Sequence, residues 1–201
     1  MKKQTKSAKR QHGYSIVELL ISLALISIFS ALAAPRLVGT YRRYQMDDLA
    51  SQVAAQVKFT RYEAIRLNGV TRCLNSPQAA QGGLLTIYTQ DALAVLANNT
   101  NVQANAKQMV FAANAPGTLV TAATVPNSGN LAAAVTAGAL TTVSPTNGSI
   151  TFDGRGAMTA PVGPSVYWVG NAVYGWRAVT VLPSGSVQVW SAADGTWRQL
   201  S

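Results

Sequence analysis

The hydrophobic pattern of the chain begins with an apolar run over residues 14–34 that contains one charged side chain, Glu18. A transmembrane helix needs about 20 predominantly apolar residues, and the run has that length. A cleavable secretory signal peptide is the competing interpretation, since Ala31-Leu32-Ala33 offers a small-residue cleavage site. However, the run is long for a signal peptide, and Glu18 lies within it. The pattern therefore predicts a membrane-spanning helix.

Helical periodicity resumes directly after Pro35, which lacks a backbone N–H and is predicted to kink the helix rather than to end it. Asn68-Gly69 follows the last periodic position and is a natural helix C-cap. We therefore expect one long helix that ends near Leu67, apolar on all sides in its first half and amphipathic in its second. The apolar stripe of the second half, expected to pack on a sheet, consists of Met46, Leu49, Val53, Val57, Ala64 and Leu67.

Beyond Gly69 the pattern changes to the period of β-strands, with turns at 153–156, 183–186 and 193–195 that predict an antiparallel meander. Residues 98–101 and 126–130 are predicted loops, and 131–140 fit a helix, a strand or a loop equally. The predicted architecture is α+β, with the long N-terminal helix packed on antiparallel β-sheet. The predicted strands span residues 70–74, 84–89, 109–112, 119–123, 149–152, 166–169, 176–182, 187–190 and 197–200.

Charge is concentrated at the N-terminus of the chain. The formal net charge is +9, and five of the cations precede residue 13: Lys2, Lys3, Lys6, Lys9 and Arg10. The high isoelectric point is therefore partly a property of this leader and is weak evidence for a nucleic-acid partner. A basic flank before a membrane span predicts that the N-terminus stays in the cytoplasm. The chain beyond Pro35 then lies across the membrane.

The scarcity of histidine and cysteine limits the chemistry of the chain. His12, in the leader, is its only histidine, and Cys73 is its only cysteine. No intramolecular disulfide can form, and we expect no His- or Cys-based metal site after the leader, because the ligands for one are missing there. Serine nucleophiles would lack a histidine base. We therefore expect no enzymatic activity, no cofactor and no metal, and we expect Cys73 to be a small buried apolar residue.

Glu18 needs a partner, because an unpaired ionisable residue inside a membrane is energetically costly, and such residues usually have a function. The simplest partner is a positive charge at the same depth. Cleavage after Gly13 would create a free α-amino group just before the apolar run and would place Glu18 fifth in the mature chain.

The N-terminus resembles the class III signal of type IV pilins and pseudopilins: a basic leader, Gly13, the aromatic Tyr14, Glu18 at the fifth mature position and Pro35 at the twenty-second. The resemblance implies that a prepilin peptidase cleaves between Gly13 and Tyr14 and N-methylates Tyr14. It also implies that Glu18 pairs with the N-terminus of a neighbouring subunit during assembly. The first mature residue is usually Phe in that family, and we expect Tyr14 to be tolerated.

Three segments resemble the GspH/FimT group in particular: RYEAIRLNGVTRCLN (61–75), ITFDGRGAMT (150–159) and VTVLPSGSVQVW (179–190). Residues 91–147 match it weakly and are expected to be an expansion of this chain. The implied pilin-like fold divides into a prepilin leader (1–13), a transmembrane and assembly half of the helix (14–34), its amphipathic half (35–68) and a periplasmic β-rich domain (69–201).

The resemblance implies a minor type IV pilin of the FimT/FimU kind that is incorporated into a pilus or primes its assembly. A minor pseudopilin of a type II secretion system, GspH-like, is the alternative. The implied partners are prepilin peptidase, other pilins or pseudopilins in a helical filament, and an inner-membrane assembly platform. The implied location is the bacterial inner membrane, crossed once, with the N-terminus cytoplasmic and the C-terminal domain periplasmic.

DNA binding is a further alternative, because some FimT-branch members are thought to bind DNA in natural transformation. The arginines that could contact phosphates are Arg155, Arg177 and Arg198, with Lys107 as a fourth cation. The aromatic residues available for stacking on bases are Trp176, Trp190 and Trp197. We favour the simpler interpretation that the tryptophans pack in the sheet and the arginines are solvated, since the C-terminal tail holds one arginine rather than a cluster.

Overall fold

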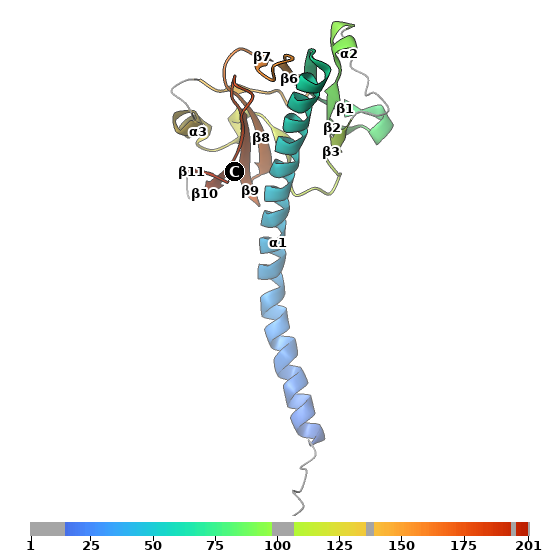
Figure 1. Cartoon of the computed structure of the whole chain (residues 1–201). Coiled ribbons are helices and arrows are strands. Elements are labelled where there is room, and N and C mark those ends of the chain that lie inside the picture. The colour runs from blue at the N-terminus through green and yellow to red at the C-terminus, as the bar shows by residue number, and fades with distance from the viewer. Residues whose placement is uncertain (1–14, 98–106, 136–138, 194–195, 201) are drawn as a thin grey trace, which may run out of the picture. The chain divides into compact units, whose positions relative to one another are not determined.

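The computed structural model describes residues 15–97, 107–135, 139–193 and 196–200 (Figure 1). The chain divides into two compact units, 1–40 and 41–201. Helix α1 (Ile16–Leu67) runs for 52 residues, which confirms the predicted long helix. Pro35 lies inside α1, so the helix continues past the proline as predicted. The kink expected there stays a prediction.

The end of α1 is the predicted C-cap. Asn68 adopts a left-handed φ of 45°, and the Gly69 N–H donates to the Ala64 carbonyl oxygen (3.1 Å). Asparagine tolerates this conformation better than most residues, so Asn68 can reverse the chain without a glycine. The chain then enters β1, the first strand of the domain.

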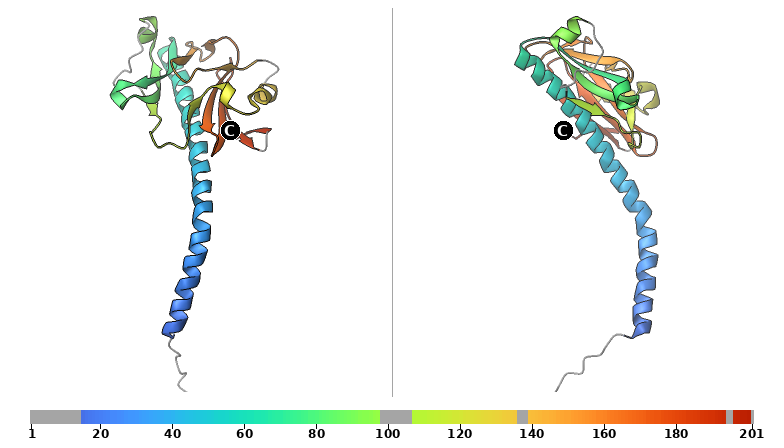
Figure 2. Two further views of the ribbon diagram at one scale, coloured as in Figure 1. Left: turned by 180° about the vertical axis from the view of Figure 1, so that it is seen from behind. Right: turned by 90° about the vertical axis from the view of Figure 1, so that its right-hand side faces the viewer.

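The strands form two sheets (Figures 1 and 2). The first sheet has the order β3-β2-β1-β6-β7, and the second has the order β11-β10-β9-β8-β4 with β5 beside β8. Pairing is antiparallel except between β5 and β8, which are parallel. The first sheet contains β1 (Thr71–Gln78), β2 (Leu84–Gln90), β3 (Gln108–Val110), β6 (Gly148–Phe152) and β7 (Met158–Ala160). The second contains β4 (Thr118–Val120), β5 (Thr141–Thr142), β8 (Ser165–Asn171), β9 (Gly175–Val181), β10 (Val187–Ala193) and β11 (Thr196–Gln199).

The predicted strands are confirmed as elements, and the meander from β8 to β11 is confirmed as a topology. Two features were missed: the strands are shared between two sheets rather than one, and β5 and β7 are too short to show a period. The predicted loop at 126–130 is wrong at its end, because helix α3 (Ser128–Val135) begins within it. Residues 98–101 and the turn residues 194–195 lie outside the described part of the chain.

Three shorter helical segments also precede α3. Helix α2 (Ala92–Leu96) was not predicted, and it is capped by the Asp91 carboxylate, which accepts a hydrogen bond from the Ala94 N–H (2.8 Å). Single turns of 3-10 helix lie at Ala79–Gln81 and Ala122–Thr124.

The second half of α1 packs against both sheets. Five of the six predicted stripe residues are buried, and the sixth, Leu67, is 41% exposed, so its assignment to the core is wrong. In the same cluster lie Ile87 and Ile150 of the first sheet and Tyr167 and Val179 of the second. One core is therefore shared by the helix and the two sheets.

Buried polar side chains join α1 to the first sheet. Gln56 donates through Nε2 to Thr89 Oγ1 (3.0 Å) and to the Lys107 carbonyl oxygen (2.8 Å). Thr60 Oγ1 also contacts Thr89 Oγ1 (2.7 Å). Buried polar groups need such partners, so the network favours one register of the helix on the sheet.

The second sheet is covered on its other face as well. Successive residues of β8 alternate between the two faces, so Tyr167 and Val169 join the core with α1 while Val166 and Trp168 join a second cluster. Leu131 of α3 is fully buried in that second cluster. Part of the weakly matched region 91–147 therefore supplies a cover for the second sheet.

The three segments that resemble the GspH/FimT group meet at one junction. The Arg61 side chain donates through Nε to the Gly156 carbonyl oxygen (3.0 Å). Gly185 has a φ of 79°, and a Cβ there would lie 2.2 Å from the same Gly156 oxygen and 2.5 Å from Arg61 Nε. The backbone of Met158 also donates to the Pro183 carbonyl oxygen (2.9 Å). The helix end and two turns thus hold one another in place.

This junction predicts that Gly185→Ala is strongly destabilising. Gly83 has the same φ of 79° but has open space around it, so Gly83→Ala is a matched control for backbone strain alone. We expect about 1 kcal/mol of destabilisation from Gly83→Ala and about 1–3 kcal/mol more from Gly185→Ala, because overpacking adds to the strain. Urea unfolding of the full chain in detergent measures the difference. Equal effects of the two variants would contradict the proposed junction.

Candidate assembly site

Glu18 lies in the first turn of α1. Ser15 directly precedes the helix, and its Oγ accepts a hydrogen bond from the Val17 N–H (3.3 Å). Ser15 and Glu18 have the Ser-x-x-Glu spacing of a capping box, and a carboxylate in the first turn is favoured by the helix dipole. Among the described residues only the Ser15 half of the box is formed, and Glu18 contributes to this terminus through the helix dipole. Sequence reasoning missed this local role of the pair, although the spacing was available as its signal.

The apolar side chains around Glu18 have no cover within the chain. The large apolar residues of α1 from Ile16 to Val38 are 50–78% exposed. Within the described residues, α1 is the one helix long and apolar enough to cross a membrane, and none of its most apolar window is buried. Exposed apolar surface is unfavourable in water by about 25 cal/mol per Å². This half of the helix therefore fits a bilayer or a contact with other apolar helices.

Several hydroxyl groups of this half-helix are satisfied within the helix itself. Ser22 Oγ donates to the Glu18 carbonyl oxygen (2.8 Å), and Ser27 Oγ donates to the Leu23 carbonyl oxygen (2.7 Å). Thr40 Oγ1 likewise donates to the Arg36 carbonyl oxygen (3.1 Å). Such bonds to the preceding turn let hydroxyls sit in an apolar environment. They leave the Glu18 carboxylate as the group that most needs an external partner.

No such partner lies within the part of the chain that the structure describes, where no cation or hydrogen-bond donor reaches the Glu18 carboxylate. Gly13 and Tyr14, the predicted cleavage and N-methylation positions, fall outside the described residues. Cleavage after Gly13 and methylation of Tyr14 therefore stay predictions. The structure does place Glu18 within one helical turn of Ser15, close to where the new terminus would form.

Two of the arginines proposed for DNA contact, Arg177 and Arg198, flank Ser191 across the second sheet, whereas Arg155 lies on the turn after β6. Arg177 is 7% exposed and forms an ion pair with Asp47 of α1, and its Nη1 also donates to the Trp176 carbonyl oxygen (3.0 Å). Arg155 is exposed on the turn after β6, and Arg198 is exposed on β11. Since Arg177 is committed to Asp47, the geometry argues against a phosphate contact by this residue.

The tryptophans proposed for stacking are mostly buried. Trp190 and Trp197 are 7% and 9% exposed, and both donate through Nε1, to Thr180 Oγ1 (3.1 Å) and to the Asn127 carbonyl oxygen (3.0 Å). Trp176 is half-buried. The remaining cation, Lys107, lies over the ring of Phe59 with its Nζ 5.1 Å from the centroid. These packing roles support the simpler interpretation of the aromatic residues.

A structural role for Arg177 predicts a loss of stability when it is replaced. Arg177→Gln leaves the Asp47 carboxylate without its partner, and we expect destabilisation of about 1–3 kcal/mol. Arg155→Gln removes the same charge from an exposed turn and should stay within about 0.5 kcal/mol of the unmodified chain. The midpoint of urea unfolding measures both. An Arg177→Gln chain as stable as the Arg155→Gln chain would show that the ion pair is not structural.

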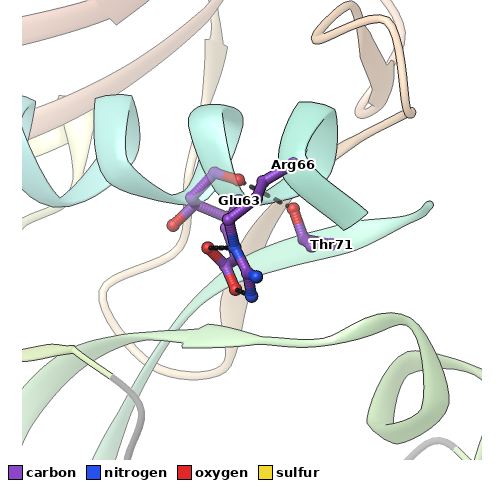
Figure 3. A network of polar contacts seen from close by, with 4 residues as sticks. Glu63, Arg66 and Thr71 are labelled. Carbon is purple, nitrogen blue, oxygen red and sulfur yellow. Dashed lines mark hydrogen bonds and ion pairs between the residues drawn. The ribbon is translucent and has the colours of Figure 1, made fainter. Parts of the chain in front are cut away.

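The end of α1 carries a second ion pair, between Glu63 and Arg66, shown with Thr71 in Figure 3. The hydrogen bond from Arg66 holds the pKa of the Glu63 carboxyl below its ordinary value. Thr71 Oγ1 donates to the Thr60 carbonyl oxygen (2.9 Å), which ties β1 back to the helix. The pair is exposed on the Arg66 side, so its contribution to stability is small. These contacts give Glu63, Arg66 and Thr71 of the 61–75 segment a structural role where α1 ends and β1 begins.

Cys73 is fully buried in the core, as expected for a small apolar residue. Burial raises the pKa of its thiol to about 11. A thiol with such a pKa is protonated at neutral pH and is a poor nucleophile. Within the described residues, no group of three His, Cys, Asp or Glu side chains is placed to hold a metal ion.

Comparison with known proteins places the clearest likeness at the N-terminus. Residues 8–34 match the family described as the prokaryotic N-terminal methylation motif. The chain is also similar to type II secretion system protein H of Xanthomonas campestris pathovar campestris, with 33% identity over 70 residues. That match covers 35% of this chain and 41% of the relative's length. No solved structure matches the chain.

Proposed function

We propose that this chain, which carries the N-terminal methylation motif of pilins and pseudopilins, is a minor subunit of a type IV pilus. The observation that carries the proposal is the uncovered apolar half of α1 with Glu18 in its first turn. Such a helix can anchor the precursor in a bilayer and can later pack with the corresponding helices of neighbouring subunits. The role is structural and needs no catalytic group or cofactor.

Processing by prepilin peptidase supplies the missing charge in this proposal. Cleavage between Gly13 and Tyr14 releases an α-amino group, which N-methylation leaves able to carry a proton. The amine of one subunit then pairs with Glu18 of its neighbour. A low-dielectric environment strengthens this attraction, and an unpaired charge left there is strongly unfavourable. A subunit is therefore held at the depth and register at which the pair forms.

The topology follows from the same segment. The apolar helix is consistent with anchoring in the inner membrane, and the basic leader favours a cytoplasmic N-terminus. The domain after the span is then periplasmic. The partners in this account are the peptidase, other pilin-like subunits and an inner-membrane assembly platform.

A second candidate is a minor pseudopilin of a type II secretion system. The similarity to type II secretion system protein H favours it, whereas the FimT-like segments and the modestly basic mature domain favour the pilus. Deletion of the gene in its host separates the two: loss of surface pili and of pilus-dependent motility supports the first, and loss of exoprotein secretion with intact pili supports the second.

The charge on Glu18 can be tested apart from its capping role. Glu18→Gln keeps a side chain that fits a capping box but cannot pair with an amine. We expect Glu18→Gln and Glu18→Ala to reduce incorporation into filaments about 100-fold or more, because a lost buried partner costs about 3–5 kcal/mol. Immunoblots of sheared filaments, normalised to membrane-bound subunit, give the measurement.

Ser22→Ala is the matched control, because Ser22 lies one turn beyond Glu18 and its hydroxyl bonds only within the helix. The Ser22→Ala chain should assemble normally. Normal assembly of the Glu18→Gln chain would mean that helix capping is sufficient and that no charge pair forms.

A further inference from the structure

Helix α1 carries two exposed surfaces of different chemistry where its packed half begins. Tyr41, Tyr44 and Asp48 have the i, i+3, i+7 spacing that places side chains on one helix face. The two tyrosines are 62% and 69% exposed, and Asp48 is exposed as well. We call these three residues the acidic face. Arg43 precedes Asp48 by five positions, which turns it about 140° around the helix, so it lies on a different side.

Arg43 lines a hollow on that other side of the helix. The hollow has a volume of about 520 Å³ and lies between α1, the β8–β9 hairpin and β10. Val173 in the turn of the hairpin is 75% exposed, and Trp176 on β9 is half-buried. Arg177 also lines the hollow, and its ion pair with Asp47 fixes the hairpin to the helix. We call Arg43, Val173, Trp176 and Arg177 the basic hollow.

The β8–β9 turn holds Val173 at the rim of this hollow. Asn171 Oδ1 accepts hydrogen bonds from the N–H groups of Val173 (2.9 Å) and Tyr174 (2.8 Å). Asn171 also donates through Nδ2 to the Pro116 carbonyl oxygen, which anchors the turn to the neighbouring loop. A surface that is already ordered loses little conformational entropy when a partner covers it. The basic hollow is therefore prepared for a contact.

The central charges of the two surfaces are unpaired. Among the described residues, neither Arg43 nor Asp48 takes part in an ion pair. The Asp48 carboxylate accepts a hydrogen bond from Gln52 Nε2 (2.7 Å). Arg42, which lines a separate hollow with Asp48, donates to Gln45 Oε1 instead (3.2 Å). An unpaired cation and an unpaired carboxylate on different sides of one helix are complementary between two copies of the chain.

The rest of the two surfaces is complementary as well. Tyrosine, tryptophan and arginine are the side chains enriched at the centres of protein interfaces. The tyrosines of the acidic face can pack on Val173 and Trp176 of another copy while its Arg43 meets Asp48. Because the two surfaces differ, the contact is heterologous and leaves one free surface at each end. Such a contact can repeat, as a filament requires.

The order of the charges along the helix suits parallel copies. Arg43 precedes Asp48 by five positions, and in the proposed function the amine at Tyr14 precedes Glu18 by four. In both pairs the cation lies on the N-terminal side of the anion. One direction of displacement between neighbouring helices therefore serves both contacts, which favours a second copy as the occupant of the hollow.

We propose that copies of this chain associate head to tail, with the acidic face of one copy docked in the basic hollow of the next and Asp48 paired with Arg43. This inference deepens the proposed function and rests on it, because it requires parallel copies anchored by α1. It adds a contact between folded domains to the pairing of Glu18.

Cysteine cross-linking of the full chain in liposomes tests the contact. A copy with Tyr44→Cys and a differently tagged copy with Val173→Cys are inserted together into vesicles of phosphatidylethanolamine and phosphatidylglycerol and treated with a short bis-maleimide. The native Cys73 contributes little, because its thiol is fully buried and protonated at neutral pH. We expect an adduct that carries both tags. Val162→Cys is the matched control, since this valine is 92% exposed and should give no adduct with Tyr44→Cys.

Charge reversal tests the pair of Arg43 and Asp48. Arg43→Glu in the Val173→Cys copy, or Asp48→Lys in the Tyr44→Cys copy, places like charges together, so either should lower the yield of adduct about tenfold or more. The two reversals combined restore opposite charges and should recover the adduct. Arg155→Glu reverses an exposed cation on the turn after β6 and should leave the yield unchanged. Loss without recovery in the combined variants overturns the assigned pair.

Insertion is measured separately by resistance to alkaline carbonate extraction. These vesicles contain no other protein, so an inserted chain without the adduct shows that a second copy does not occupy the hollow. That result overturns the head-to-tail contact and leaves the proposed function standing, as does an equal yield from Val162→Cys. An adduct between two Tyr44→Cys copies in its place would show a symmetric dimer and also overturns the inference. A chain that carbonate extracts overturns both the inference and the proposed function.

Discussion

The pairing requirement of Glu18 is the constraint on which the account of this protein depends. The carboxylate lies in the first turn of a helix whose apolar side chains are uncovered, and the neighbouring serines bond within the helix. A plain membrane anchor would gain nothing from such a charge. A helix whose new N-terminus can pair with the carboxylate of a neighbour gains a defined depth and register. In the proposed assembly, charge and apolar surface therefore act together: the apolar surface allows the helices to associate, and the pair specifies their depth and register.

The rest of the fold separates this assembly surface from the folding core. Burial in α1 starts at Met46, and from there the helix packs on two sheets through an apolar stripe and through the Gln56–Thr60–Thr89 network. The end of the helix is held by the Arg61–Gly156–Gly185 junction. The outer face of the second sheet is covered by α3 and neighbouring segments. The domain thus buries most of its large apolar side chains, with exceptions such as Leu93, Leu96 and Val162, whereas the first half of α1 leaves its apolar side chains exposed.

Elements with sustained apolar periodicity, or with recognisable turn and cap residues, were predictable from the sequence. The 52-residue helix, its Asn68 cap and the meander of β8–β11 follow from apolar periodicity and turn chemistry. The division into two sheets was not predictable, because both sheets present the same alternation to the same helix. Strands β5 and β7 have two and three residues, too few to show a period. Helix α3 begins at Ser128-Gly129-Asn130, residues that favour loops, and it is held by tertiary burial of Leu131.

The candidate site was predictable only where its chemistry is local. Glu18 stands out because a single charge interrupts an apolar run, whereas the partner of Arg177 could not be seen, since Asp47 lies 130 positions away. Such pairs depend on tertiary contacts that no local pattern encodes.

The most direct test of the account is the intact mass and N-terminal sequence of the chain isolated from its native membrane. The account predicts a mature chain that begins at N-methylated Tyr14, which carries Glu18 as its fifth residue. A chain cleaved after Ala33 would instead be the product of an ordinary signal peptide and would have lost Glu18. That result, or a chain that retains residues 1–13, would contradict the central claim that a newly formed amine is the partner of Glu18.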